Sequence, residues 1–231
     1  MYDIEMEGRV DREIAAFLEE EHAAKGDALY GWYRHRFLAA NNKYLTSTIG
    51  LAPYDKAIAR FVVEHCSFAK RFVEVGAGLA QESMLLAMQG MATYAIETNL
   101  ANFDMLTRLR ARLAQRLDPD LPKRMTPIND FFPRRASEYV DADTILTFPT
   151  LSWTIDATQE RAIFDSLRAA GGVILSAQDF FRNRPELAEQ EELIRQIRSR
   201  GFDAPVEVHS WTEWHMGFRP DRIVFMKRSA S

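Results

Sequence analysis

Short apolar runs alternate with amphipathic segments through most of the chain, from about Pro53 onward. The apolar runs are rich in β-branched and aromatic residues, a composition typical of buried strands. Strands are therefore predicted at residues 71–75, 93–97, 125–128, 144–148 and 173–177.

Helices are predicted in most of the connecting segments, because apolar residues recur there at intervals of three and four. Pro53 and Pro185 suit a first helical turn, Asp156 suits an N-cap, and Gly90 and Gly201 suit positions just after a C-terminus. The predicted helices cover residues 53–66, 79–89, 103–117, 156–170 and 185–200.

Two further strands are predicted near the end of the chain, at residues 206–211 and 222–226. About ten residues separate them, which is too few for the helical crossover that parallel strands require. These two strands should be antiparallel to each other, whereas the strands that alternate with helices should be parallel. The pattern predicts an α/β protein with a Rossmann-like, mostly parallel seven-stranded sheet and an antiparallel C-terminal strand.

The first fifty residues have a different pattern. Ile14, Phe17 and Leu18 form one apolar helical face, and three aromatic residues between positions 30 and 37 form a second. We expect residues 1–50 to form a cap of two helices and residues 51–231 to form the Rossmann-like domain.

Composition limits the classes of function. The 231 residues carry a formal net charge of −4, and 47% of them are hydrophobic. A mildly acidic chain does not favour nucleic acid as a partner, because an extended phosphate-binding surface is basic. No apolar run approaches the roughly 18 residues that span a bilayer, and the first residues do not resemble a signal peptide. With Cys66 as its one cysteine, the chain is expected in the cytoplasm.

The first predicted strand leads into the segment Glu74-Val-Gly-Ala-Gly-Leu-Ala80. Gly76 allows a sharp turn, Gly78 allows backbone to approach a ligand, and the small Ala80 permits close packing of the next helix. Glu97 ends the second strand, 21 residues after Gly76. A carboxylate there can accept hydrogen bonds from both hydroxyls of a ribose.

Each of these features also has a structural interpretation. The glycines could form only a tight turn, Glu97 could be a solvated carboxylate, and Glu74 could be the charge partner of the following helix N-terminus. An acid at position 74 argues against a dinucleotide enzyme, because it would repel the pyrophosphate.

With these features in this order, residues 53–228 resemble the class I S-adenosylmethionine-dependent methyltransferases. The resemblance implies S-adenosylmethionine as the methyl donor. It places the donor on the acid and glycine loop after strand one, on the ribose-binding acid after strand two, and on an acidic–aromatic pair after strand three. The matching positions and their neighbours are Glu74, Gly76, Ala77, Gly78, Glu97, Thr98, Asp130 and Phe131. The antiparallel last strand is also typical of this family.

The acidic–aromatic pair is the least specific of these matches. Asp130 could simply begin a turn, and Phe131 could belong to the hydrophobic core, where aromatic residues at strand ends are usually found.

Candidates for the transfer step are scattered. Methyl transfer from a sulfonium needs alignment of donor and acceptor, and a protonated acceptor also needs a base. His215, between the last two strands, is the first candidate for that base, with a surface imidazole as the alternative. His35, Tyr44 and Asp179 could line the acceptor pocket or cover the donor. Phe148 ends the fourth strand and is expected near the methyl group.

No metal site is predicted, because the five histidines lack metal-ligand spacing and the fourth strand ends without an acid. Residues 147–149 also lack the Asn/Asp-Pro-Pro-aromatic motif of enzymes that methylate adenine or glutamine nitrogen. The resemblance therefore implies methyl transfer to an oxygen or nitrogen of a small or medium-sized acceptor, such as a sugar, lipid or specialised metabolite. The alternatives are a non-catalytic donor-binding protein of the same shape and a nucleotide-dependent oxidoreductase.

Overall fold

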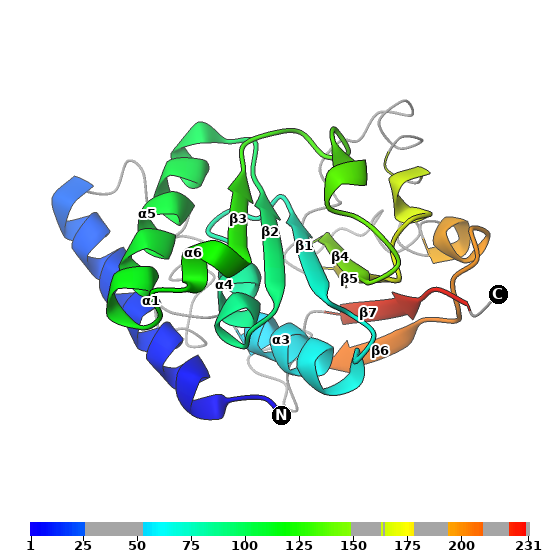
Figure 1. Ribbon diagram of the computed structural model, residues 1–231, viewed down its shortest axis with the longest axis horizontal. Helices are drawn as coiled ribbons and strands as arrows, with labels where there is room; N and C mark the ends of the chain where they lie inside the picture. Colours follow the sequence, from blue (N-terminus) through cyan, green and yellow to red (C-terminus); the bar gives the residue numbers. More distant parts are fainter. Residues whose placement is uncertain (26–52, 149–162, 164, 178–193, 210–221, 230–231) are drawn as a thin grey trace, which may run out of the picture.

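A seven-stranded sheet forms the centre of the computed structural model, which describes residues 1–25, 53–148, 163, 165–177, 194–209 and 222–229 (Figure 1). The strands lie in the order β3-β2-β1-β4-β5-β7-β6. Their bounds are β1 Arg71–Val75, β2 Ala92–Ile96, β3 Met125–Ile128, β4 Thr144–Phe148, β5 Gly172–Ala177, β6 Val206–His209 and β7 Arg222–Lys227.

The strand directions confirm the predicted sheet. Neighbouring strands are parallel from β3 through β2, β1 and β4 to β5, and β7 is antiparallel to both β5 and β6. The chain builds outward from β1 toward β3 and then from β4 in the other direction. The carboxyl ends of β1 and β4 therefore adjoin at a topological switch point, where open α/β sheets bind their ligands.

Most described helices follow the predicted pattern. Helix α3 spans Pro53–His65 and α5 spans Leu100–Arg116, close to the predicted bounds. Helix α4 spans Gln81–Met88, so the predicted start at Leu79 was two residues early, because Ala80 has a left-handed backbone conformation. Helix α6, Leu121–Arg124, and the 3-10 turn η2, Ala136–Glu138, were not predicted. The described parts of the two later predicted helices are helical near residues 163–167 and 194–198.

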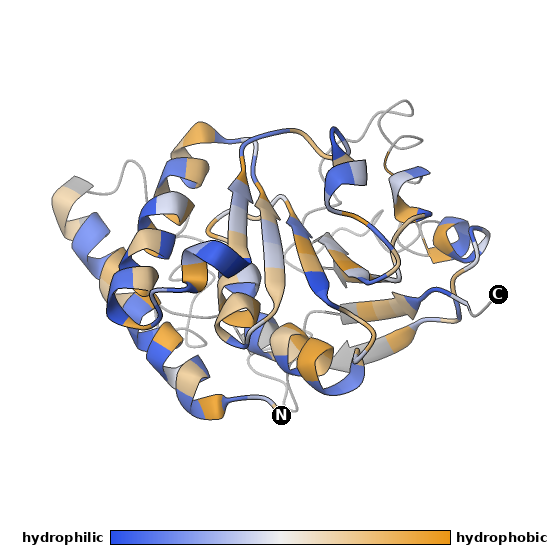
Figure 2. Cartoon of the chain, in the orientation of Figure 1, coloured by the Kyte–Doolittle hydropathy of each residue, from blue (hydrophilic) through white to orange (hydrophobic). Residues whose placement is uncertain are grey.

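Hydrophobic side chains cover both faces of the sheet. Figure 2 shows strands of mostly apolar and intermediate residues, while α1 and α5 carry both polar and apolar residues. On one face, Phe72, Ala95 and Ile145 pack against α3, α4 and α5. On the other face, Val73 and Leu146 pack against the segment around η2 and the helical residues near positions 167 and 197. Successive residues of a strand thus point to opposite faces of the sheet and contribute to two separate hydrophobic cores. This is what a parallel sheet requires when helices cover both of its faces.

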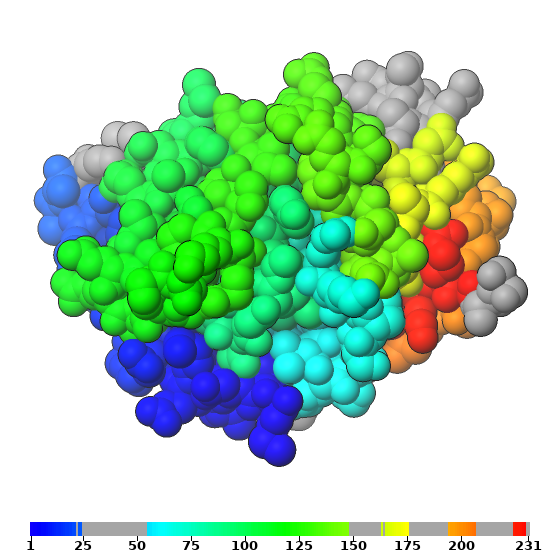
Figure 3. Space-filling model, viewed as in Figure 1, coloured from blue at the N-terminus to red at the C-terminus, as the bar shows by residue number. Residues whose placement is uncertain are grey.

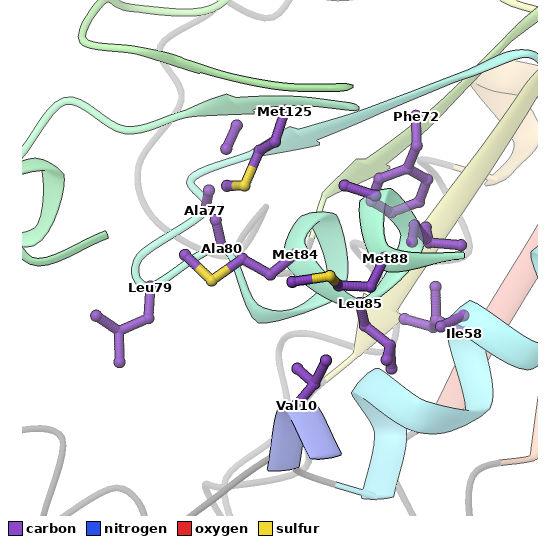
Figure 4. Packing of buried hydrophobic residues seen from close by; sticks show 14 of the residues in the cluster. Val10, Ile58, Phe72, Ala77, Leu79, Ala80, Met84, Leu85, Met88 and Met125 are labelled. Atoms are coloured by element: carbon purple, nitrogen blue, oxygen red, sulfur yellow. The ribbon is translucent and has the colours of Figure 1, made fainter. Parts of the chain in front are cut away.

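The N-terminal helix α1, Ile4–Lys25, adds to the first of these faces. Its predicted apolar face is confirmed, because Ile14, Phe17 and Leu18 are buried. Figure 3 shows α1 on the surface beside α5 and α3, and Figure 4 shows Val10 and Ile58 approaching α4 from two sides. The second predicted cap helix lies outside the described residues, so the boundary at residue 50 stays a prediction.

Ion pairs fix the position of α1. Arg60 of α3 donates two hydrogen bonds to Glu7, at 2.8 and 2.9 Å, and Tyr2 donates a third at 2.8 Å. Arg112 of α5 donates to Glu13 at 2.9 Å and to Glu20 at 2.6 Å. Burial raises the pKa of the Tyr2 hydroxyl above its usual value, and the hydrogen bond to Glu7 adds to the rise. The helix is thus attached through polar contacts at both of its ends and through apolar contacts between them.

No helix among the described residues is both long and apolar enough to cross a lipid bilayer.

Gly171 occupies a position that its lack of a side chain makes possible. Its N–H donates to the carbonyl of Thr144 at 3.0 Å, and its carbonyl accepts from the N–H of Arg228 at 2.8 Å. A Cβ at this position would lie 2.1 Å from the carbonyl oxygen of Ala142. Two backbone segments therefore approach each other closely at Gly171.

We expect Gly171→Ala to destabilise the protein by about 1–3 kcal/mol, because backbone must move to admit the methyl group. Gly8→Ala is the matched control, since a Cβ on this α1 residue meets no atom closer than 3.6 Å. Alanine there should stabilise the helix by about 0.5–1 kcal/mol. Urea unfolding followed by circular dichroism measures both changes, and equal effects would contradict the packing described for Gly171.

Candidate functional site

The loop from β1 to α4 lies at the carboxyl edge of the sheet and contains three left-handed residues. Gly76 has φ 73°, Gly78 has φ 57° and Ala80 has φ 56°. The loop bends back over β2, because the N–H groups of Gly76 and Ala77 both donate to the carbonyl of Ile96 at 2.9 Å. Figure 4 shows Ala77, Leu79 and Ala80 along this loop. The glycines make the tight turn possible, as predicted, and the buried Ala80 holds a strained conformation that L-residues rarely adopt.

Glu97 holds this loop from the adjacent strand end. Its Oε2 accepts a hydrogen bond from the N–H of Gly78 at 2.7 Å, and its Oε1 accepts one from the N–H of Asn99 at 2.6 Å. The side chain is buried, so the solvated carboxylate considered as an alternative is wrong. Each carboxylate oxygen can still accept a second hydrogen bond. Glu97 therefore faces the glycine loop with acceptor capacity in reserve.

Two asparagines fix the turns on either side of Glu97. Asn99 caps α5, because its side chain accepts hydrogen bonds from the N–H groups of Ala101 and Asn102. Asn129, after β3, donates from Nδ2 to the carbonyl of Glu97 at 2.7 Å. The ends of β1, β2 and β3 are thus joined by polar contacts. Thr98, which lies between Glu97 and Asn99 in the sequence, is exposed.

Glu74 points into the protein beneath the loop. Its Oε2 accepts hydrogen bonds from the N–H of Ser83 at 2.9 Å and from the Ser83 hydroxyl at 2.7 Å. Ser83 lies in the first turn of α4, where backbone N–H groups have no partner within the helix. Ala80, the N-cap residue, offers no side-chain acceptor. The interpretation of Glu74 as partner of the following helix N-terminus is therefore confirmed as part of its role.

Burial raises the pKa of Glu74 to about 8, even though the two hydrogen bonds from Ser83 act to lower it. The negative charges of Asp55 and Glu97 add to the rise. Desolvation dominates because a carboxylate loses most of its hydration when it is only 4% exposed.

The predicted acidic–aromatic pair follows β3. Asp130 Oδ1 accepts a hydrogen bond from the N–H of Phe131 at 2.7 Å and lies 3.1 Å from Nη1 of Arg134. Phe131 is 42% exposed, so its interpretation as a core residue is wrong, and Phe132 is the buried ring instead. The turn considered for Asp130 does form, and it presents an aromatic ring at the edge of the sheet.

The candidates for the transfer step lie mostly outside the described residues. This holds for His215, His35, Tyr44 and Asp179, while Phe148 ends β4 and is described only by its backbone. Within the described ranges, no group of three or more His, Cys, Asp or Glu side chains is arranged to hold a metal ion.

Several residues at this edge were not anticipated. Asn99 could have been found, because an asparagine before an amphipathic helix is a typical N-cap. Ser83 and Asn129 carry no such signal, since their contacts join separate elements. Asp55, in the first turn of α3, and Thr147, on β4, are buried polar residues, and neither belongs to a recognisable motif.

Solved structures of methyltransferases are similar to this chain in their fold. The magnesium protoporphyrin IX methyltransferase of Synechocystis PCC 6803, determined with bound S-adenosylmethionine, matches with a TM-score of 0.61 and 14% identity, over 92% of this chain and 97% of that one. The chain has the fold of a class I methyltransferase. A glycopeptide N-methyltransferase, MtfA, matches with a TM-score of 0.54 and 15% identity, over 75% of this chain and 95% of that one.

A third match is an enzyme named for a different class of substrate. An rRNA methylase from Streptococcus thermophilus has a TM-score of 0.50 and 13% identity, over 78% of this chain and 96% of that one. No protein-family model matches the sequence, and no curated protein is similar to it in sequence. At these identities the likeness establishes the fold, and chemistry must be argued from the site.

Replacing Glu74 by glutamine should change how stability depends on pH. Because the pKa of Glu74 rises from 4.5 to about 8 on folding, the unfolded chain releases this proton at lower pH than the folded protein. The contribution of Glu74 to the stability of the wild type should therefore fall between pH 4.5 and pH 8 and then level off. Glu74→Gln should not show this loss. At pH 8 the free energy of unfolding of the variant should exceed that of the wild type by an amount on the order of a few kcal/mol.

Urea unfolding at pH 5, 6, 7 and 8 tests this expectation. The wild type and Glu74→Gln should converge at pH 5 and diverge as the pH rises, with the variant the more stable at pH 8. Parallel profiles for the two proteins would mean that Glu74 titrates like an exposed glutamate.

Proposed function

We propose that the protein is a methyltransferase that uses S-adenosylmethionine as its methyl donor. The observation that carries this proposal is the contact between Glu97 and the N–H of Gly78 at 2.7 Å. It places a buried acid with spare acceptor capacity directly beside the glycine loop at the switch point of the sheet. A ribose beside this loop would find its hydroxyl acceptor already in position.

The surrounding residues suit the other parts of the donor. Gly76 and Gly78 leave backbone accessible without a Cβ, and Phe131 offers an exposed ring against which adenine can stack. Glu74 and Glu97 make the edge acidic, which suits a ligand with a cationic ammonium. S-adenosylmethionine supplies a methyl group already activated on a sulfonium, so the protein mainly aligns the acceptor and excludes water.

The same charges argue against a dinucleotide. A pyrophosphate binds at a helix N-terminus through unpaired N–H groups, but at α4 the N–H and hydroxyl of Ser83 already bind Glu74. The strand order, with antiparallel β7 between β5 and β6, also differs from the 3-2-1-4-5-6 order of dinucleotide-binding sheets. An oxidoreductase is therefore the weaker proposal.

For the acceptor, we retain a small or medium-sized molecule methylated on oxygen or nitrogen. One reason is the acidic balance of the chain, which has a net charge of −4. The other is that residues 147–149 lack the Asn/Asp-Pro-Pro-aromatic motif of enzymes that methylate adenine or glutamine nitrogen. His215 remains the proposed base and Phe148 the proposed wall near the methyl group. The proposed location is the cytoplasm.

Binding of S-adenosylhomocysteine, the product form of the donor, tests the donor site. A ligand at about 100 times its dissociation constant should raise stability by about 2.7 kcal/mol, which is visible as a shift in melting temperature. NADH at the same excess should give no shift. The opposite result, with a response to NADH alone, would favour the oxidoreductase.

Glu97→Gln should weaken S-adenosylhomocysteine binding about 10- to 100-fold, because an amide offers one acceptor oxygen where the carboxylate offers two. Glu64→Gln is the matched control, since Glu64 is exposed on α3 away from the loop. Titration calorimetry at a temperature where all three proteins are folded measures the change. Unaltered affinity in Glu97→Gln would contradict the assignment of Glu97 to the ribose.

A further inference from the structure

The turn after β3 contains two adjacent arginines whose side chains bind different acids. Arg134 Nη1 lies 3.1 Å from Oδ1 of Asp130, whereas Arg135 donates two hydrogen bonds to Glu138, at 2.6 and 2.7 Å. Both arginine side chains lie largely in solvent, with exposed fractions of 72% and 58%. The two ion pairs therefore have similar surroundings, but only the pair of Arg134 involves an acid that directly follows the end of β3.

The carboxylate of Asp130 has one occupied oxygen and one oxygen in reserve. Oδ1 accepts the hydrogen bond from the N–H of Phe131 at 2.7 Å and the one from Arg134, while Oδ2 accepts none from the described residues. The side chain of Asp130 is only 17% exposed, so this oxygen lies at a partly buried edge of the protein. Because a carboxylate oxygen only accepts hydrogen bonds, a group that binds Oδ2 must be a donor.

A buried tyrosine anchors the turn that carries Arg134. The N–H of Arg134 donates to the carbonyl of Phe131 at 2.8 Å, which closes the turn. The carbonyl of Arg134 accepts a hydrogen bond from the Tyr139 hydroxyl at 3.1 Å. Tyr139 is buried, and its ring stacks on Tyr94 of β2 with 5.6 Å between the ring centroids. The backbone of Arg134 is therefore attached to the sheet, although its side chain is exposed.

The position of Asp130 relative to Glu97 indicates what the free oxygen can reach. Asn129, directly before Asp130, donates to the carbonyl of Glu97 at 2.7 Å, and β2 and β3 are neighbouring parallel strands. In the proposed function Glu97 binds the ribose and Phe131 stacks on the base. A base joined to that ribose and stacked on that ring would present its edge to Asp130.

We propose that Arg134 is a positioning residue for the base of the donor: it holds Oδ1 of Asp130 and thereby keeps Oδ2 directed to the edge of the base. The inference rests on the proposed function, because it requires the donor site. A carboxylate that is already held in one orientation loses less side-chain entropy when the ligand binds. Its free oxygen favours a base with an amino group over one with a carbonyl oxygen at the same place, since two acceptors cannot pair. Arg134 thus increases the selectivity of the site without touching the donor.

The affinities for S-adenosylhomocysteine and S-inosylhomocysteine test this role, because a carbonyl oxygen replaces the amino group of adenine in the second ligand. Titration calorimetry gives the ratio of the two dissociation constants for each protein. The wild type should prefer S-adenosylhomocysteine about 10- to 100-fold. Arg134→Gln should reduce this ratio about two- to fivefold, which is the range for an exposed ion pair. A general disturbance of the turn would weaken both ligands equally and leave the ratio unchanged.

Two further variants show whether Arg134 acts through Asp130. Arg135→Gln is the matched control, because it removes a similarly exposed ion pair from the same turn, and it should leave the ratio unchanged. Asp130→Asn should lower the ratio by itself. In the Asp130→Asn protein, the additional Arg134→Gln substitution should have no further effect on the ratio, because the acid through which Arg134 acts is already gone.

The outcomes distinguish this inference from the proposed function. If the wild type binds the two ligands equally, or if Arg134→Gln leaves the ratio unchanged, the inference is overturned and the donor site stands. The inference is also overturned if Arg135→Gln lowers the ratio as much, or if Arg134→Gln lowers it equally in the Asp130→Asn protein. If neither ligand binds to the wild type, the donor site is overturned and the inference with it.

Discussion

The geometry of the carboxyl edge depends on the carboxylate of Glu97. One oxygen holds the glycine loop after β1 and the other holds the turn that starts α5, while Asn129 ties the chain after β3 to the backbone of Glu97. A buried carboxylate is stable only where hydrogen bonds replace its lost hydration, and here the backbone supplies them. Because one residue serves both loops, the shape of the edge exists before any ligand arrives.

Glu74 gives the same edge a second property, a buried carboxyl group at the start of a helix. A helix N-terminus usually attracts anions, but at α4 a side chain from β1 already occupies that position. The edge therefore offers carboxyl oxygens that accept hydrogen bonds, where phosphate-binding sheets offer N–H groups that donate them. This difference, more than the glycines themselves, separates the proposed donor site from a dinucleotide site.

Much of the sheet could be predicted from the sequence, because each strand is a short apolar run whose neighbours follow from chain order. The hairpin of β6 and β7 followed from the length of its connection, and the buried face of α1 followed from Ile14, Phe17 and Leu18. The start of α4 was misplaced, because the left-handed conformation of Ala80 depends on packing beneath the loop and leaves no local signal. The contact of Asn129 with the carbonyl of Glu97 escaped prediction, since it joins residues whose proximity exists only after folding. The exposure of Phe131 depended on which of two adjacent phenylalanines the turn buries.

The position of β7 has a consequence for how the chain is made. Strand β6 precedes β7 in the sequence, yet its partner in the sheet is β7, which lies between β6 and β5. During synthesis on a ribosome, β6 emerges before the strand that attaches it to the sheet exists. The exposed side of β5 and all of β6 must therefore remain unpaired until β7 is inserted between them. Such unpaired edges are the places where a nascent chain is most exposed to aggregation, so the last steps of folding at this end of the sheet are those in which the chain has most to gain from a chaperone.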